Sequence, residues 1–415
     1  MGSVPNNLTG GELEQLEAAS MHTSCIHQAE LSADGTCVFT SDYNRTLSVY
    51  RVPEEGEKDL LVPCSSLTSS EPIWAFTGYS SFNAANALSS LVLISTRNNF
   101  VSLHNALYSY SSSDTDGGPE AASSNSPLDI SAKLLSYRNF NTKTEAVISP
   151  HSLLFTRSGT HFLAGTQDSI FLFDLHNSSG PIDEFRTHSK RDPQSYKGIV
   201  SSLSISCDSI LAAGTWTRYV GLYEAEGSGN PITTISLPGG PSWNPGHRGN
   251  DNELAGGGIS EVKWSPCGRY IYVAERDSDV LMFYDIRNLS LGLGYCKGRN
   301  ALAKQKLGFG VWTAAAADEV FAREGGVEVL ADNERENLGV RTVDHEIWAG
   351  GIDGVVRVWR DPHLRQGALE ADQVLQVGED PVVGTMVNEN GTAMAVASGR
   401  RESVFPDEDA EGEGR

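Results

Sequence analysis

An internal repeat constrains the fold of this chain more than any other feature of its sequence. Five segments share one pattern: an alternating apolar strand, a turn rich in Ser, Asp and Gly, a second strand, a tight polar turn, and a third strand that ends in an aromatic residue. The segments are residues 29–50, 152–174, 201–223, 259–285 and, as a partial copy, 346–359, with weaker copies at 91–104 and 382–398. Apolar residues that alternate with period two between frequent turns predict antiparallel sheet.

Seven such units predict an all-β, seven-bladed propeller. One unit cannot bury its apolar faces alone, so consecutive units stack around an axis. We expect the first and last units to meet, because a closed ring leaves no exposed sheet edge. Asp353-Gly354 predicts a hairpin turn, and residues 309–312 predict the first strand of the sixth blade. The aromatic residues that end the third strands are expected in the core: Tyr50, Phe173, Tyr223, Tyr284 and Trp359.

The chain is longer than its blades require. A propeller blade of this type spans about 40 to 45 residues, so part of the 415-residue chain must lie in long loops. We expect a partly disordered N-terminal segment at residues 1–21, a propeller at residues 22–405 and an acidic disordered tail at residues 406–415. Two insertions interrupt the propeller, a low-complexity one at residues 108–127 and an acidic, partly helical one at residues 314–343.

The charge balance narrows the classes of partner. The chain has 31 Lys and Arg against 53 Asp and Glu, a net charge of −22, which excludes a broadly basic nucleic-acid coat but allows a local basic patch. No apolar run approaches the roughly 20 residues of a membrane span, so no membrane partner is expected. The six cysteines form no C-x-x-C pair, which predicts reduced thiols, no zinc site and a cytosolic or nuclear protein.

The common catalytic motifs are missing from the sequence. It contains no P-loop, no H-E-x-x-H zinc motif and no G-x-S-x-G nucleophile motif. His345-Glu346 begins like the zinc motif but lacks its second histidine. We therefore expect a non-catalytic protein with no metal and no cofactor. A propeller hydrolase remains an alternative, which assays for metal-dependent or ester-directed activity would exclude.

Basic and aromatic residues gather in the turns between the second and third strands of the units. In a propeller these turns share one rim with the loops that link successive blades. The candidate RNA-binding residues in the turns are Arg45, Arg97, Arg218 and Arg276, with Trp216 and Tyr219 beside Arg218. Those in the loop between the third and fourth blades are Arg186, His188, Lys190, Arg191 and Lys197. Such cations contact phosphates and such rings stack on bases.

Several stretches carry a resemblance to a known family. Phe173-Asp174 and Tyr284-Asp285 stand where a WD repeat has its Trp-Asp pair, and Trp359 keeps the Trp alone. In order and spacing, residues 180–206, 212–232, 257–288 and 397–414 resemble the telomerase Cajal body protein family of WD-repeat proteins. The resemblance extends over about residues 22 to 410. We expect this chain to lack the long N-terminal extension typical of animal members.

The resemblance implies a non-catalytic nuclear scaffold, Cajal-body-like or nucleoplasmic and also present in the cytoplasm. Its implied partners are a small non-coding RNA (small Cajal body RNA, small nuclear RNA or telomerase RNA) and the proteins of that ribonucleoprotein particle. Fungal relatives connect the family to small nuclear ribonucleoproteins and pre-mRNA splicing. We expect a monomeric propeller within a larger complex.

Other readings of the same residues stay open. Arg45 and Arg276 have aspartates nearby with which they can pair, and Trp216 can pack between blades. In WD repeats an Asp in the second turn organises the hairpin, a role that the resemblance implies for Asp42, Asp168 and Asp353. The main alternative function is a WD-repeat adaptor that binds proteins and no RNA. It would take a basic peptide at the mouth of the central channel, and the net charge of −22 favours it.

Overall fold

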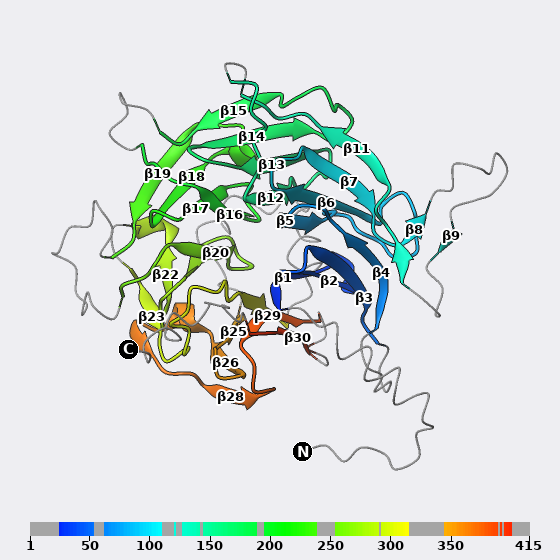
Figure 1. Cartoon of the computed structure of the whole chain (residues 1–415). Coiled ribbons are helices and arrows are strands. Elements are labelled where there is room, and N and C mark those ends of the chain that lie inside the picture. The colour runs from blue at the N-terminus through cyan, green and yellow to red at the C-terminus, as the bar shows by residue number, and fades with distance from the viewer. Residues whose placement is uncertain are drawn as a thin grey trace, which may run out of the picture.

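The alternating strands of the repeat form sheets that radiate from a central axis (Figure 1). The computed structural model describes residues 25–53, 62–109, 120–121, 127–141, 144–188, 195–238, 254–289, 292–314, 344–388, 391 and 394–400. Within these ranges the only helical elements are 3-10 turns, η1 (Ala225–Gly227), η2 (Ile286–Asn288) and η4 (Pro362–Leu364). The all-β propeller predicted from the sequence is confirmed.

Each blade is an antiparallel sheet whose innermost strand comes first in the chain. Blade 1 contains β1 (Ile26–Leu31), β2 (Cys37–Asp42), β3 (Thr46–Arg51) and β4 (Pro63–Thr68), with β10 (Leu128–Asp129) added in parallel. Blade 2 contains β5 (Ile73–Gly78), β6 (Leu91–Thr96), β7 (Val101–Asn105) and β11 (Lys133–Tyr137). Blade 3 contains β12 (Ser152–Phe155), β13 (His161–Gly165), β14 (Ser169–Asp174) and β15 (Asp183–Arg186).

The second half of the ring repeats this order. Blade 4 contains β16 (Val200–Ile205), β17 (Leu211–Thr215), β18 (Tyr219–Tyr223) and β19 (Pro231–Ser236). Blade 5 contains β20 (Ile259–Trp264), β21 (Tyr270–Glu275), β22 (Leu281–Asp285) and β23 (Gly294–Cys296), extended by β27 (Gly367–Leu369). Blade 6 contains β24 (Phe309–Trp312), β25 (Glu346–Gly350), β26 (Val355–Arg360) and β28 (Gln373–Gln376). A small ribbon, β8 (Tyr108–Ser109) with β9 (Glu120–Ala121), falls in the first predicted insertion.

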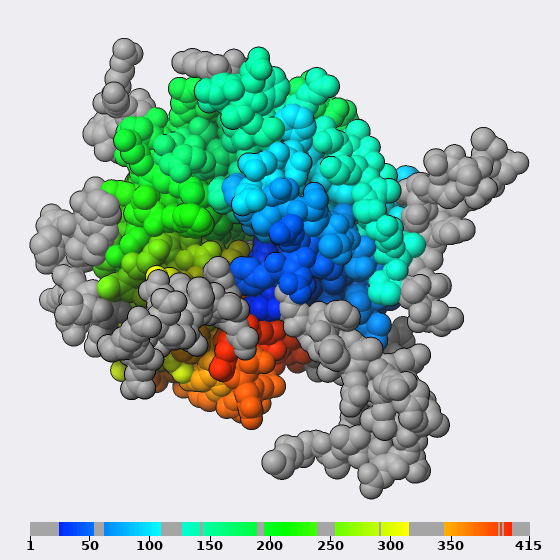
Figure 2. Space-filling model, in the orientation of Figure 1, coloured from blue at the N-terminus to red at the C-terminus, as the bar shows by residue number. Residues whose placement is uncertain are grey.

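The ring has six blades and not the seven predicted. The seventh unit provides only a two-stranded hairpin, β29 (Val382–Val387) and β30 (Met394–Ser398), in the described part of the chain. This hairpin packs against blade 1, where Met386 and Ala397 join Val38 in one apolar cluster. Figure 2 shows its red atoms beside the blue atoms of the first blade. The repeat pattern predicted the inner two strands of this unit, but no further strands complete it among the described residues.

The middle strands of a blade are buried on both faces because each blade is covered by two neighbours. All six residues of β21 are buried, and such strands read as continuous apolar runs. The predicted core aromatics Phe173, Tyr223, Tyr284 and Trp359 are buried, whereas Tyr50, beside the hairpin, is half-buried. The core therefore lies between blades and leaves the turns and inner strands for function.

Several other expectations can be placed on the structure. Gly354 has a φ of 71°, as the predicted Asp353-Gly354 turn requires, and β24 forms the first strand of the sixth blade as predicted. All six cysteines are free thiols. Residues 1–21, 406–415 and nearly all of 314–343 lie outside the described residues. No helix in the described ranges is long and apolar enough to cross a membrane.

Candidate nucleic-acid interface

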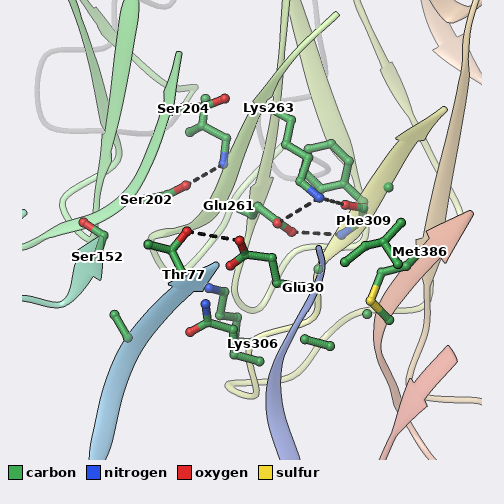
Figure 3. A pocket seen from close by; sticks show the side chains of 18 of the residues that line it. Glu30, Thr77, Ser152, Ser202, Ser204, Glu261, Lys263, Lys306, Phe309 and Met386 are labelled. Atoms are coloured by element: carbon green, nitrogen blue, oxygen red, sulfur yellow. Dashed lines mark hydrogen bonds and ion pairs between the residues drawn. The ribbon is translucent and has the colours of Figure 1, made fainter. Parts of the chain in front are cut away.

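A central channel of about 440 Å³ runs between the inner strands of the six blades and the final hairpin (Figure 3). Its wall is rich in small hydroxyl side chains that join neighbouring blades. Ser152 donates a hydrogen bond from Oγ to the carbonyl of Val200 at 2.8 Å, and Ser202 Oγ accepts one from the N–H of Val262 at 2.9 Å. The channel wall is thus polar, and its geometry is fixed by contacts between blades.

Charged side chains form a network on one side of the channel (Figure 3). Glu261 pairs with Lys263 at 3.1 Å and accepts a hydrogen bond from the N–H of Phe309 at 2.9 Å. The Lys263 ammonium lies 5.3 Å from the centroid of the Phe309 ring. Burial alone would raise the pKa of Glu261, but Lys263, Lys306 and the Phe309 N–H lower it below its ordinary value. Glu261 is therefore an ionised, fully engaged carboxylate.

Glu30 is the less stabilised carboxylate of the channel. It accepts hydrogen bonds from Thr77 Oγ1 at 3.0 Å and from the N–H of Gly78 at 3.1 Å. Burial raises the pKa of Glu30 to about 7, and the two hydrogen bonds only partly oppose that shift. Burial also lowers the pKa of Lys306, which has no hydrogen-bond partner within the described residues. The channel thus holds one strongly paired and one weakly paired carboxylate.

At one end the channel opens into a second cavity of about 350 Å³, which we call the channel mouth. The mouth is continuous with the channel, since His27, His151 and Lys306 line both cavities. Its lining is defined by five ring-bearing and two cationic side chains: His27, Tyr43, Trp74, His151, Trp216, Arg276 and Lys306. These residues come from blades 1 to 5 and from the segment before β24.

A recurring β-bulge places several of these side chains. The pairing of the innermost strand shifts after its first residue in five units, between Ile26 and Gln28, Ile73 and Ala75, Val200 and Ser202, Ile259 and Glu261, and Val382 and Gly384. A bulge leaves one residue unpaired and redirects its side chain. In four of the units the bulged residue lines the mouth, as His27, Trp74, Ser201 or Ser260.

The aromatic rings of the mouth are stacked or tilted against one another. The rings of Trp74 and His151 lie 4.2 Å apart at an interplanar angle of 15°, and the His151 ring meets Trp216 edge to face at 5.5 Å. Across the cavity, His27 lies 5.2 Å from Tyr43. Trp216 remains 43% exposed and Tyr43 40% exposed. The mouth therefore offers partly exposed rings on which a planar base can stack.

Positive charge adjoins these rings. The Arg276 guanidinium lies 5.9 Å from the centroid of the Trp216 ring, and its Nη1 donates a hydrogen bond to the carbonyl of Lys304 at 2.6 Å. Burial, with a contribution from Lys306, lowers the pKa of His27 to about 4, and burial lowers the pKa of His151. Both histidines are neutral rings at neutral pH, so Arg276 and Lys306 supply the positive charge of the mouth.

The predicted site residues divide into two groups in space. Trp216, Arg276 and Asp42 line the mouth. Arg45 and Arg97 are exposed turn residues of the same rim, where Arg45 donates to the carbonyl of Ser70 at 2.5 Å and Arg97 pairs with Glu71 at 3.0 Å. The common rim is confirmed by backbone hydrogen bonds from turns to blade-linking loops, such as Trp216 N–H to Ile199.

Four other predicted residues are not among the side chains that line the mouth. Arg186 is on the outermost strand β15, where it pairs with Glu184 at 3.1 Å. The Tyr219 ring stacks on Tyr196 at 5.7 Å. Lys197 is exposed, and its carbonyl accepts a hydrogen bond from Thr217. His188 is half-buried, whereas Lys190 and Arg191 lie outside the described residues.

Arg218 is engaged inside the protein. Its side chain is 11% exposed and forms a two-point pair with the fully buried Glu275, at 2.7 Å from Nε and 2.8 Å from Nη2. Nη2 also donates to the carbonyl of Leu254 at 2.9 Å. A backbone φ of 68° turns this residue toward blade 5. Two of its three guanidinium nitrogens are thus engaged inside the protein, so we do not include Arg218 in the RNA-binding surface.

The three turn aspartates all accept hydrogen bonds near their turns. Asp42 Oδ1 accepts from the N–H of Thr46 at 2.8 Å, and Asp168 Oδ1 accepts from the N–H of Gly198 at 2.6 Å. Asp353 pairs with Arg357 at 2.7 Å and accepts from the N–H of Val355 at 3.3 Å. These contacts are local in blades 1 and 6, but at Asp168 they reach the loop that begins blade 4.

Sequence reasoning missed most of the aromatic mouth. Five residues of the mouth were not predicted, because the pattern within one turn does not show which residues meet across the ring. They are His27, Tyr43, Trp74, His151 and Lys306. A usable signal existed: a β-branched residue begins each bulged inner strand, and the next position holds His27 in one unit and Trp74 in another. Aligning the units on that residue would have placed both rings at one level of the channel.

Comparison with known proteins gives relatives but no family model. No family model matches the chain. Telomerase Cajal body protein 1 of Bos taurus is 23% identical over 424 residues, which cover 99% of this chain and 64% of the relative. The Homo sapiens protein of the same name is 22% identical over 383 residues, covering 90% of this chain and 56% of the relative. The chain thus spans less than two thirds of the length of these two relatives.

A fungal protein also matches. Guanine nucleotide-binding protein negative regulator 1 of Schizosaccharomyces pombe is 24% identical over 358 residues, which cover 82% of this chain and 71% of the relative. The resemblance to the telomerase Cajal body proteins, first seen in a few motifs, is confirmed as similarity along most of the chain.

Proposed function

We propose that this relative of the telomerase Cajal body proteins is a non-catalytic nuclear scaffold that binds a small non-coding RNA at the channel mouth. The relatives support a role with ribonucleoprotein particles, in Cajal-body-like bodies or the nucleoplasm. One observation carries the RNA-binding part: Trp74 stacks on His151 beside a partly exposed Trp216 that lies under the Arg276 guanidinium. Stacking rings with an adjacent cation are the groups that hold unpaired bases and their phosphates.

Single-stranded loops and bulges of a folded RNA suit this geometry. A cavity of about 350 Å³ is of a size to admit an unstacked base but not a helix. The exposed arginines Arg45 and Arg97 lie on the same rim and would contact the backbone of the flanking stem. Because the protein is strongly acidic, binding depends on this local patch and not on overall charge. Functions in particle assembly, localisation or splicing would follow from the RNA that is bound.

A protein-only adaptor is the second candidate, and the channel itself favours it. Glu30 is a weakly paired carboxylate in a polar channel, a site where a basic side chain of a peptide would be stabilised. The two functions make opposite demands on the mouth. RNA binding needs its rings and cations, whereas a basic peptide needs Glu30 and is repelled by Arg276 and Lys306.

The first experiment is crosslinking and immunoprecipitation of the tagged chain, followed by sequencing of the bound RNA. Enrichment of one class of small nuclear, small Cajal body or telomerase RNA supports the proposal and names the client. Recovery of background RNA together with stable protein partners would overturn it in favour of the adaptor.

Affinity measurements with the enriched RNA then test the site. Trp216→Ala should weaken binding about 5- to 150-fold, the range for losing one stacked base, and leave the salt dependence unchanged. Arg276→Met should also weaken binding and lower the slope of log affinity against log salt by about one. Arg287→Ala is the matched control. Arg287 is an exposed arginine just after β22 that pairs with Asp285 and does not line the mouth, so its loss should leave the affinity unchanged. Unchanged affinity in both mouth variants would remove the site from the mouth.

A further inference from the structure

A second cluster of ligand-type side chains lies at blade 6, where strands β25 and β26 begin and end. Asp344 precedes β25, Asp361 follows β26, and His363 is the middle residue of η4. One ligand atom from each of the three side chains lies within 4.8 Å of the other two. These residues stand at the opposite end of the strands from the Asp353-Gly354 turn, and therefore on the face of the ring opposite the channel mouth.

The hairpin register brings the three residues together. Glu346 pairs with Arg360 as the last register pair of β25 and β26, so the residues just beyond it meet at one edge. His345 and Asp361 exchange two backbone-anchored hydrogen bonds: the N–H of His345 donates to Asp361 Oδ1, and the N–H of Asp361 donates to the carbonyl of His345, both at 2.9 Å. Asp361 has φ 44° and ψ 49°, which turns the chain back so that His363 returns to the cluster.

His363 is the observation that points to a ligand. Its side chain is only 4% exposed, yet neither ring nitrogen has a hydrogen-bond partner among the described residues. One face of its ring stacks on His345 at 4.3 Å, and the ring of Tyr270 lies 5.1 Å away. His345 is held in turn by a 2.6 Å hydrogen bond between its Nε2 and the Tyr272 hydroxyl. Buried polar atoms without partners are rare because they cost free energy.

We propose that Asp344, Asp361 and His363 form a binding site for a divalent transition-metal ion of the Zn²⁺ type. Two carboxylate oxygens and one imidazole nitrogen are ordinary Zn²⁺ ligands, and a water completes a four-coordinate shell. Asp344 and Asp361 bring negative charge that a bound cation neutralises.

A metal ion at this position would join two separate connections of blade 6. Asp344 ends the connection from β24 to β25, whereas Asp361 and His363 begin the connection from β26 to β28. Metal binding therefore stabilises the folded blade, by an amount that rises with the logarithm of the free metal concentration once that concentration exceeds the dissociation constant. The site shares no residue with the channel mouth, so it is independent of the proposed RNA function.

The test is metal binding by the full chain without a histidine tag, after dialysis against a chelator. Titration with Co²⁺ should give visible d–d absorption bands that saturate at one ion per chain. Zn²⁺ should displace the Co²⁺ and should raise the midpoint temperature of thermal unfolding. Asp344→Asn changes an exposed side chain and should lower affinity at least tenfold without unfolding the protein. His363→Gln should abolish the d–d bands. Asp208→Asn, an exposed aspartate in a turn of blade 4, is the matched control and should bind as the parent chain does.

Two results would overturn the proposal. One is the absence of saturable binding by the parent chain, which would mean that His363 is satisfied by water. The other is a thiolate charge-transfer band that persists in His363→Gln, which would place the metal on cysteines instead.

Discussion

The pair of Arg218 and Glu275 gives the sharpest prediction about stability. Arg218→Met removes a guanidinium that makes three hydrogen bonds and leaves Glu275, whose side chain is fully buried, without its countercharge. Breaking a buried pair from one side costs about 3 to 5 kcal/mol, because the remaining charge stays desolvated. We expect that loss in the free energy of unfolding. Arg218→Met/Glu275→Met, which replaces both partners with apolar side chains, should recover most of it.

The assay is reversible urea unfolding followed by tryptophan fluorescence. Arg97→Ala provides the control, since its pair with Glu71 is half-exposed at 51% and 34% and should contribute at most about 1 kcal/mol. A loss below about 1 kcal/mol for Arg218→Met, or a double variant no more stable than the single one, would refute the reasoning. RNA affinity adds a second check: if Arg218→Met lowered the salt slope by about one without loss of stability, Arg218 would contact phosphate after all.

Two further predictions concern the junction with the final hairpin and the channel. Gly350→Ala places a methyl group against the side chain and carbonyl of Val382 and should destabilise the fold by about 1 to 3 kcal/mol, whereas Gly378→Ala, with no atom in reach, should change the urea midpoint little. Glu30 has a pKa of about 7 in the folded state against 4.5 for the free group, so the folded state binds more protons between these values and stability falls as pH rises through them. Glu30→Gln should therefore match the parent chain at pH 4 and exceed it by about 1 to 3 kcal/mol at pH 8; equal pH profiles of unfolding would contradict this.

Much of the ring followed from the sequence because each blade is a local structure. In the unit at residues 152–174, three alternating strands and two polar turns are complete within 23 residues, and they form β12, β13 and β14 in that order. The number of blades did not follow, because it depends on whether the last unit acquires outer strands from elsewhere. The unit at residues 382–398 looked like the others over its inner half, but among the described residues it forms only the hairpin β29–β30.

Only two of the seven side chains that define the mouth of the candidate site were among the predicted residues, for a similar reason. Trp216 and Arg276 were found because both lie in turns whose composition stands out. Trp74 and His151 were not, since a bulge and the curvature of the ring bring them to Trp216 from other blades. Arg218 looked like its neighbours in sequence, but its partner Glu275 is 57 residues away. A pattern within one turn carries no information about such a pair.

The closing hairpin also sets the order in which the ring can be completed during synthesis. β1 ends at Leu31 and β29 begins at Val382, so the ribosome needs roughly 20 to 70 s to make the chain between them. Throughout that time the nascent blade 1 lacks the neighbour that covers Val38. Apolar surface that stays exposed for so long is bound by chaperones, which keep the unfinished chain from aggregating. The supply of finished protein would then depend on chaperone capacity as much as on the stability of the closed ring.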